Sequence, residues 1–449
     1  MSYRIMVTIV LFCHYMSAFS ALGMPLFLPL MLQELNAPLQ SSWVGLLFIL
    51  PTLMTAIAAR FWGHFADTYG RKTSLLRAEL GLAVGFLICG FSQSLWQLII
   101  GLSIQGLFGG TMAASNAYLA TSITDKNALK QVLNFTQFSA RLALITAPIG
   151  LGFLVYHYEV LSLYRVLAIL PLLAFLLSCW LKKDVISAVN VVKKANTIEL
   201  PKTAANTQVH RPIYIPTPTS NAYTETTSGK KVKSYKQEAH HSVQRITGAN
   251  FFTNPYLFLS LLQFFLAFCM VATFPYFLPF AKTFGLSTSQ IGQLYAMPHV
   301  IYLICQLLSG RLRIRMPTSS LTLGFTVLAV AALLHLSDYL ALIWLARMLF
   351  GAGMFMCYQS LHAQMASTNQ SKHSGKIFSR YDALSKWGGV LAGLSVTLFV
   401  PMFGLLFPFV ISAVMAVIAM IIIKMHQHYL TNPENHNQPK KVTKKRQLL

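Results

Sequence analysis

The sequence predicts an all-α membrane protein with twelve transmembrane helices in two six-helix halves. Of its 449 residues, 55% are hydrophobic and only 10% are charged, whereas roughly a quarter of the residues in a soluble domain are charged. Apolar runs that reach the roughly 20 residues needed to cross a bilayer follow one another along the chain. A long polar segment divides these runs into two groups of six.

The first group of apolar runs starts close to the N-terminus and is joined by short connections. These runs lie near residues 7–32, 43–62, 74–93, 95–120, 131–156 and 162–181. The first run is too long for the core of a signal peptide, and no small-residue cleavage pattern follows it, so we expect a retained helix. Residues 1–181 are therefore predicted to form an N-terminal six-helix bundle.

Residues 182–255 form the polar segment between the halves. They are rich in Lys, Thr, Ser, Asn and Pro and show no apolar period that could build a core, which predicts a disordered basic linker. His240 and His241 lie in this linker, but no further ligands stand at a useful spacing, so we expect neither a metal nor another cofactor. The six cysteines stand singly in apolar runs and are interpreted as small core residues.

The second group of apolar runs follows this linker. Its runs lie near residues 256–281, 291–309, 318–336, 340–366, 377–400 and 402–423. They predict a C-terminal six-helix bundle over residues 256–423, followed by a cytoplasmic basic tail over residues 424–449.

The two halves carry an internal repeat. When the second half is laid on the first, Gly45 matches Gly292 and Pro51 matches Pro298. Halves of this kind are related by a pseudo-twofold axis along the membrane normal and rock against each other around a site near the bilayer midplane. The repeat therefore indicates a duplicated six-helix unit.

The distribution of Lys and Arg predicts the orientation in the membrane. Basic residues gather on one set of connections, which holds Arg71, Lys72, Lys126, Lys130, Arg311, Arg313, Arg315, Lys372 and Lys376. The opposite connections hold only Arg165 and Lys282. Under the positive-inside rule the linker, the tail and both termini are cytoplasmic, as expected in a bacterial cytoplasmic (inner) membrane. The formal charge of +23 then reflects topology and anionic lipid headgroups, not binding of nucleic acid.

One connection carries a recognisable motif. Between the second and third apolar runs stand Gly63, Asp67, Gly70, Arg71 and Lys72, within the stretch GHFADTYGRK. This stretch resembles the Gly-x-x-x-Asp-x-x-Gly-Arg-Lys/Arg signature of major facilitator superfamily transporters, which implies a carrier with these residues as a conformational gating motif. We expect a tight turn with a glycine at each end, in which Asp67 accepts hydrogen bonds from the start of a neighbouring helix. The alternative is an ordinary basic membrane turn.

A second element resembles this family in part. Gln105 and Gly106 are similar to the end of an Arg-x-x-Gln-Gly element of proton-coupled members, but Leu102 stands in place of the arginine. Arg347, its mate in the repeat, keeps the arginine and is either a substitute for it or a structural residue.

A third element, residues 147–152, resembles the Gly-Pro-x-x-Gly-Gly element of exporters and favours export. The match is partial, because Ala147 and Leu151 replace glycines, and only Pro148 and Gly152 are kept. The alternative is that Pro148 and Gly152, like Gly106, only kink and pack the helices.

Two cations are predicted near the middle of the membrane, Arg141 in the fifth run and Lys386 in the eleventh. The repeat places Arg141 on Lys386 and Gln137 on Asp382. An ionisable residue in a spanning helix is costly and marks a functional site by default. We therefore predict that both cations face one cavity from opposite halves and, with Gln137, bind an anionic substrate. In the alternative, Asp382 and Lys386 form an internal ion pair and Arg141 caps backbone carbonyls.

Three residues are candidates for carrying a coupling proton: Asp382, Glu79 and His14. Carboxyl and imidazole groups are the side chains whose protonation responds most readily to burial and to nearby charge. Asp382 ranks first, because its protonation would free Lys386 to bind an anion. Glu79 lies near the cytoplasmic end of its run, where the alternative is that it snorkels or pairs with Arg77.

Together these features predict a secondary active transporter that exports a small organic molecule in exchange for protons. The excess of membrane cations favours an anionic metabolite, such as a carboxylate siderophore, although a drug is a further candidate. The alternatives are an importer of an organic anion or a metal-siderophore, and a non-transporting membrane receptor or scaffold. No Gly-x-x-x-x-Gly-Lys-Ser/Thr loop is present, so ATP is not the direct energy source. The sequence shows no nucleophile paired with a base and no cofactor fingerprint, so we do not expect an enzyme. A monomer is the default for this architecture.

Overall fold

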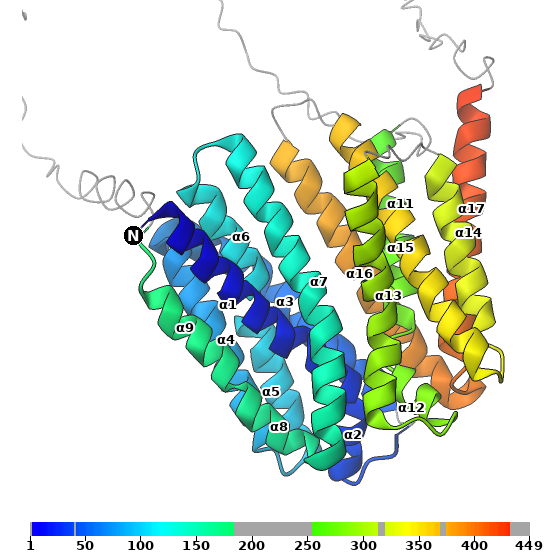
Figure 1. Cartoon of the computed structure of the whole chain (residues 1–449), viewed down its shortest axis with the longest axis horizontal. Coiled ribbons are helices and arrows are strands. Elements are labelled where there is room, and N and C mark those ends of the chain that lie inside the picture. The colour runs from blue at the N-terminus through cyan, green and yellow to red at the C-terminus, as the bar shows by residue number, and fades with distance from the viewer. Residues whose placement is uncertain (1, 40–41, 184–253, 313–318, 369–373, 432–449) are drawn as a thin grey trace, which may run out of the picture.

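The computed structural model describes residues 2–39, 42–183, 254–312, 319–368 and 374–431, and every regular element in these ranges is a helix (Figure 1). Within these ranges, eleven helical spans are long and apolar enough to cross a membrane, and one further apolar helix is shorter. The chain is therefore a multi-pass, all-α membrane protein, as predicted. Most of the predicted linker and tail lies outside the described residues.

The N-terminal half holds six spans, some of which are interrupted. Its helices are α1 (Tyr3–Gly23), η1 (Met24–Phe27), α2 (Leu28–Glu34), α3 (Ser42–Tyr69), α4 (Arg71–Gly90), α5 (Leu95–Phe108), α6 (Thr111–Ser122), α7 (Lys126–His157), α8 (Val160–Leu167) and α9 (Ile169–Cys179). The first span tightens at η1, where Pro25 removes a backbone donor. The fourth breaks at Gly110, whose positive φ of 87° favours glycine.

The C-terminal half lies beside the first (Figure 1). Its helices are α11 (Pro255–Ala272), α12 (Phe277–Lys282), α13 (Thr288–Leu312), α14 (Ser319–Leu334), α15 (Leu340–Thr368), α16 (Ser374–Phe403) and α17 (Phe407–Thr431). The shorter apolar helix is α14. Residues 313–318, just before it, fall outside the described ranges.

The internal repeat reappears as equivalent contacts. Within the first half, a Cβ on Gly106 of α5 would collide with the backbone of Pro51 in α3. Within the second half, a Cβ on Gly351 of α15 would collide with the backbone of Pro298 in α13. Each glycine thus lets one helix pack directly on the backbone of a proline-containing neighbour.

Two equivalent seams join the halves. In the first seam, Gly292 of α13 lies against Pro148 and Gly152 of α7. In the second seam, Gly45 of α3 lies against Gly393 of α16. Both seams lie near the starts of α3 and α13. These helices start at the end of the bundle that holds α2 and α12, here called the distal end, which is the lower side of Figure 1. Small residues let the two halves approach closely at this end.

The connection between the second and third spans differs from its prediction. Helix α3 continues to Tyr69, so Gly63 lies inside a helix, with open space where a side chain would be. Only Gly70, with a φ of 97°, forms the turn before α4 begins at Arg71. The expected turn with a glycine at each end is therefore wrong at Gly63. A single glycine on an exposed helix face costs too little to end a helix.

Side chains fasten this connection to the rest of the first half. Asp67 and Arg71 form an ion pair across the turn, so Asp67 contacts a side chain at the start of α4. Lys72 donates to the carbonyl of Cys179 (2.7 Å) and to that of Leu181, just past α9. A cation at the carbonyl end of a helix is favourable. The start of α4 is thereby tied to both the second and the sixth spans.

Candidate functional site

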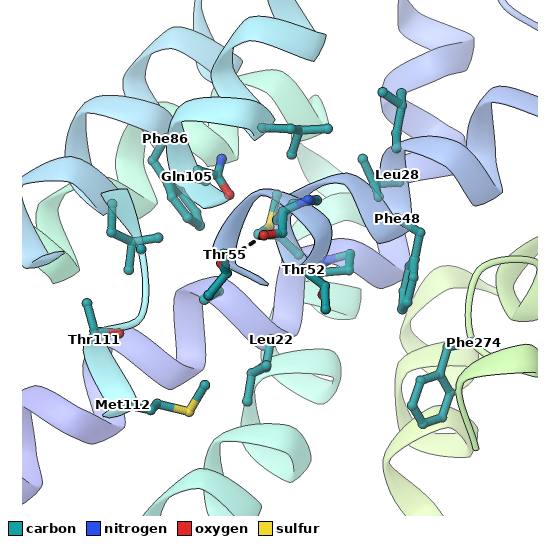
Figure 2. A pocket seen from close by; sticks show the side chains of 18 of the residues that line it. Leu22, Leu28, Phe48, Thr52, Thr55, Phe86, Gln105, Thr111, Met112 and Phe274 are labelled. Atoms are coloured by element: carbon teal, nitrogen blue, oxygen red, sulfur yellow. Dashed lines mark hydrogen bonds between the residues drawn. The ribbon is translucent and has the colours of Figure 1, made fainter. Parts of the chain in front are cut away.

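A cavity of about 370 Å³ lies in the first half and reaches the second. Figure 2 shows side chains of α3, α5 and α6 around this central cavity, with Phe274 of the second half at its edge. Phe48 of α3 and Phe274 contact each other there, with ring centroids 6.4 Å apart. The cavity therefore lies where both halves can touch one occupant.

The lining of the central cavity is mainly apolar. Its larger apolar side chains are Leu22, Met24, Leu28, Leu47, Phe48, Leu82, Phe86, Leu102, Met112, Leu144, Val271 and Phe274. Several polar side chains of the lining already form hydrogen bonds within the protein. Thr55 donates to the carbonyl of Pro51 (2.8 Å), and Gln105 donates to the sulfur of Cys89 (3.2 Å). Among the described residues that line this cavity, Lys386 is the only charged one.

Lys386 of α16 stands where several cavities meet. Besides the central cavity it lines three others, of about 300, 230 and 220 Å³. One of these lies between α3 and α16, with Ile57 and Trp387 on its two sides. The side chain of Lys386 is exposed. The structure therefore places one of the two predicted cations in the walls of four cavities.

Arg141 has different surroundings. Its guanidinium crosses from α7 to the second half and lies 4.2 Å from the ring centroid of Tyr302 and 5.3 Å from that of Tyr358. It also donates to Nδ1 of His299 (3.4 Å) and contacts the sulfur of Met354 (3.9 Å). We call these five side chains the Arg141 cluster. It joins α7 to α13 and α15.

Arg141 lines none of the four described cavities that Lys386 lines, so these cavities do not support the prediction that both cations face one cavity. The described contacts of Arg141 are also not the backbone carbonyls of the alternative. They are aromatic rings, an imidazole and a thioether, which stabilise a guanidinium by cation–π attraction and hydrogen bonding. Tyr358 nevertheless links the two sites, since it lines one cavity with Lys386.

Gln137 and Asp382 remain candidate residues. Gln137 lies one turn before Arg141 on α7 and is exposed. Asp382 lies one turn before Lys386 on α16, and its side chain is outside the described residues. The substrate role of Gln137 and the proton role of Asp382 stay predictions.

A polar chain beside Lys386 was not expected from the sequence. The hydroxyl of Tyr381 donates to Oε1 of Gln263 (2.8 Å), whose Nε2 donates to Ser385 (3.1 Å). Gln263 is a buried polar residue in the middle of α11. Its place inside an apolar run was the available signal, because a polar residue there must find a partner.

Glu79 lies in the interior of the first half and is only 1% exposed. Its Oε1 accepts a hydrogen bond from Ser178 of α9 (3.0 Å), and its Oε2 has no hydrogen-bond partner among the described residues. The alternative that Glu79 snorkels or pairs with Arg77 is wrong. Arg77 instead donates to the carbonyl of Phe108 (2.8 Å) and lies over the ring of Trp62.

His14 of α1 is also buried, and its Nδ1 lies 2.9 Å from the hydroxyl of Ser139 in α7. Neither His14 nor Glu79 lines the central cavity. The structure thus places both candidate proton carriers in the packed interior of the first half, apart from Lys386.

Arg347 has a structural environment. It is fully buried, and its Nε and Nη2 donate to the carbonyls of Leu294 (3.1 Å) and Tyr295 (2.9 Å) in α13. Pro298 lacks the N–H that would otherwise bond the Leu294 carbonyl, so Arg347 supplies the missing donor. In the first half the equivalent residue, Leu102, lines the central cavity instead.

Comparison with known proteins identifies relatives of this chain. The family model described as Major Facilitator Superfamily matches residues 7–319 and 259–449. The Multidrug resistance protein MdtG of Salmonella arizonae is 34% identical over 169 residues, which cover 37% of this chain and 41% of that protein. MdtG of Klebsiella pneumoniae is 33% identical over 175 residues, or 38% of this chain and 42% of the relative. The chain thus spans less than half the length of the curated relatives it matches.

Solved structures show the same fold at low identity. A D-xylose-proton symporter superposes with a TM-score of 0.68 and 15% identity, covering 94% of this chain and 96% of that one. A POT family transporter in complex with 5-aminolevulinic acid has a TM-score of 0.67 and 10% identity, with 95% and 96% covered. The human organic anion transporter MFSD10 has a TM-score of 0.59 and 14% identity, with 94% and 99% covered.

Proposed function

From the premise that this chain belongs to the major facilitator superfamily, we propose that it is a secondary transporter that exports a small organic molecule in exchange for protons. The observation that carries this proposal is the central cavity, which is lined by both halves and, within the described ranges, by one charged side chain, that of Lys386. The similarity to MdtG, whose name describes multidrug resistance, supports export.

The seams support alternating access as the mechanism. They hold the halves together at the distal end through Gly292 and Gly45. Lys386 lies closer than Gly393 to the start of α16, and one of its cavities lies between α3 and α16. Rocking about the substrate site would open the seams and close the linker side. The Asp67–Arg71 pair spans the turn between α3 and α4, which supports the proposal that this motif takes part in the movement.

We propose the orientation that the basic connections predict, with the linker and both termini in the cytoplasm of a bacterial cell. The structure as described would then be open toward the cytoplasm and closed outside. A monomer can carry out this cycle, because the cavity is complete within one chain.

Export and import differ in whether the proton and the substrate move in opposite directions or in the same direction. If Asp382 must be protonated before Lys386 accepts an anion, proton and anion travel together, and an inward proton gradient drives import. Export requires that the proton stabilises the conformation that does not hold the substrate. Glu79 suits this second role, because burying a charged carboxylate with one unpartnered oxygen is costly. We therefore assign the coupling proton of export to Glu79, with Asp382 as the site that favours the importer alternative.

The test compares small molecules in spent medium by untargeted mass spectrometry. Cells lacking the gene would be complemented with the wild type, with Glu79→Gln, with Lys386→Met or with an empty vector, at matched membrane abundance. We expect a compound that is missing from the medium without the gene and that neither variant restores.

Each other outcome identifies an alternative. A compound that accumulates outside cells lacking the gene means import. If the small molecules in spent medium are the same in all four strains, and the protein and its variants reach normal membrane abundance, the result favours a receptor or scaffold.

A further inference from the structure

We propose that the cavity between α3 and α16 is a lateral portal, through which a lipid-soluble organic molecule passes from the bilayer to the central cavity. This inference rests on the proposed function and adds the route and the chemical class of the substrate. It favours a drug-like molecule over the carboxylate siderophore that the count of membrane cations suggests.

Two facing stripes of apolar side chains line this portal. The stripe residues stand three or four positions apart, which puts them on one face of each helix. They are Leu53, Ala56 and Ile57 in α3 and Ala383, Trp387 and Val390 in α16. The portal has a volume of about 300 Å³, at the lower limit of the roughly 300–1,000 Å³ typical of small-molecule sites, so an organic molecule can occupy it.

Helices α3 and α16 touch at one end of these faces and separate at the other. At the second seam, a Cβ on Gly393 of α16 would collide with Ile49 of α3. Leu53 follows Ile49 by about one turn in α3, and both helices line a cavity from there on. On the α16 side, Val390 precedes Gly393 by about one turn. The portal therefore starts directly beside the seam and extends away from the distal end.

The outer side of the portal faces lipid. Ile57 is 62% exposed and Trp387 is 53% exposed, and neither lines the central cavity. At 1.5 Å per residue, Leu53 and Ile57 lie about 16–23 Å along α3 from its start at Ser42. This depth is within a hydrocarbon core of about 30 Å and beyond its middle. The portal thus faces the leaflet on the side away from the distal end.

The inner side of the portal adjoins the central cavity. Lys386 and Val390 also line a cavity of about 230 Å³. Phe48, Thr52 and Val271 line both this cavity and the central one. Side-chain rotamers change within nanoseconds at exposed positions. The walls between these three cavities can therefore open without movement of a helix.

The equivalent interface, between α7 and α13, is closed by large side chains. There Arg141 reaches across the halves to His299 and to the ring of Tyr302. In the repeat, Thr52 and Thr55 of α3 are equivalent to these two residues of α13. Both threonines are smaller, and both line cavities. The space that an imidazole and a phenol fill in one interface is thus left as cavity in the other, which explains why this side opens.

The position of the portal selects the class of molecule. Apolar surface leaves water spontaneously, so a lipid-soluble molecule concentrates in the bilayer beside the portal. A molecule with several carboxylates stays in water, because a charge is costly to place in hydrocarbon. The two apolar stripes favour the same class.

The experiment photolabels the purified full chain in lipid nanodiscs. The probe is 3-(trifluoromethyl)-3-(3-iodophenyl)diazirine, a small apolar compound that dissolves in the bilayer. Peptide mass spectrometry measures how much probe is attached to Phe48 and Met112 of the central cavity. Ala56→Trp, which fills the portal, should lower this labelling at least threefold. Trp387→Ala, which widens the portal, should raise it at least twofold.

The matched control is Val84→Trp. It adds the same side chain as Ala56→Trp, at a position of α4 that is 41% exposed and lines neither the portal nor the central cavity. It should leave the labelling of Phe48 and Met112 unchanged. Labelling of Val414, an exposed residue of α17, is the internal reference for each sample. The melting temperature of each variant checks that the protein remains folded.

The spent-medium comparison supplies a second readout. At matched membrane abundance, Ala56→Trp should lower the amount of the exported compound at least threefold, whereas Val84→Trp should not change it.

The inference is overturned if either portal variant leaves the labelling of Phe48 and Met112 unchanged. It is also overturned if Ala56→Trp lowers the labelling but not the export, because the cavity would then hold bilayer lipid without serving as a route. Failure of the export proposal looks different. In that case the labelling responds as expected, but no compound is missing from the medium of cells that lack the gene.

Discussion

Arg141 and Lys386 occupy equivalent positions in the repeat, yet their surroundings follow from different side-chain chemistry. The lysine ammonium is compact and strongly hydrated, and Lys386 extends into cavities. The arginine guanidinium is planar and stacks on aromatic faces, and Arg141 lies over Tyr302 and beside Tyr358. One cation therefore lines the central cavity, while the other joins the two halves.

This difference predicts what replacing Arg141 does. Arg141→Leu should remove a cross-half attraction of about 1–2 kcal/mol and lower the melting temperature of the purified protein. Arg141→Lys should recover part of the loss, because it keeps the charge but not the planar stacking. Arg60→Leu, at an exposed arginine of α3, is the control. An unchanged melting temperature for Arg141→Leu would show that the cluster does not hold the halves together.

His335, in the turn after α14, predicts a pH dependence of folding. It is buried against Phe409, with ring centroids 4.4 Å apart, and its Nδ1 lies 2.7 Å from the carbonyl of Ala331. Burial, with the positive charge of Arg347 as a smaller cause, lowers the pKa of His335 to about 3. The unfolded chain, with a histidine pKa near 6.5, then takes up a proton that the folded protein excludes.

Stability is therefore lost as the pH falls below about 6.5 toward 3, and His335 accounts for about 2 kcal/mol of that loss by pH 5. We expect His335→Leu to reduce the drop in melting temperature between pH 7.5 and pH 5. The control His157→Leu, at an exposed histidine, should leave the drop unchanged. Equal drops in wild type and His335→Leu would contradict the prediction.

At the scale of elements, prolines and glycines decide how helices pack. Pro298 frees a carbonyl in α13, Arg347 of α15 bonds it, and Gly351 lets the two helices meet. In the first half Pro51 and Gly106 make the same close contact without the arginine. The second half thus has a buried hydrogen-bonded arginine, Arg347, where the first half has a cavity.

Arg347 and Pro298 should be energetically coupled. Arg347→Met leaves the carbonyls of Leu294 and Tyr295 without their donor, at a cost of about 1–3 kcal/mol. In a Pro298→Ala background the cost should be smaller, because the new backbone N–H can bond the Leu294 carbonyl. Melting temperatures of the two single variants and the double variant measure this coupling. Additive effects would mean that Arg347 does not compensate for the proline.

The first seam predicts a sensitive glycine. A methyl group on Gly292 would lie against the backbone of Pro148, so Gly292→Ala should push α13 away from α7 at a cost of about 1–3 kcal/mol. The distal end would then close poorly, and transport should fall more than membrane abundance does. Gly150→Ala on α7 is the matched control, because it has open space at that position. Equal transport by both variants would argue against a working seam.

At the scale of the whole molecule, the two halves meet in two ways. Near the distal end they share a buried apolar cluster that includes Phe27 and Met31 of the first half with Phe277, Ile291 and Val396 of the second. Around Lys386, cavities lie between the two halves. In the proposed transport cycle, this contrast would make one end the closed side while the other admits a ligand.

The joined surfaces predict that the halves assemble without a covalent link. Residues 1–181 and 256–449, produced together as separate chains, should co-purify from membranes, because the seams and the shared cluster connect them. Copies carrying Gly292→Ala should co-purify less well. Recovery of each half alone would show that the linker is needed to hold the pair.

The sequence by itself determined the membrane class, the helical spans, the internal repeat and the two membrane cations. These properties rest on local composition and on spacing within one helix, which the chain shows directly. It did not determine that Gly63 lies inside α3, that Glu79 packs against Ser178, or that Arg141 lies among side chains of α13 and α15. Only the tertiary structure decided these, because each depends on which faces of distant helices meet, and a one-dimensional pattern carries no information about that pairing.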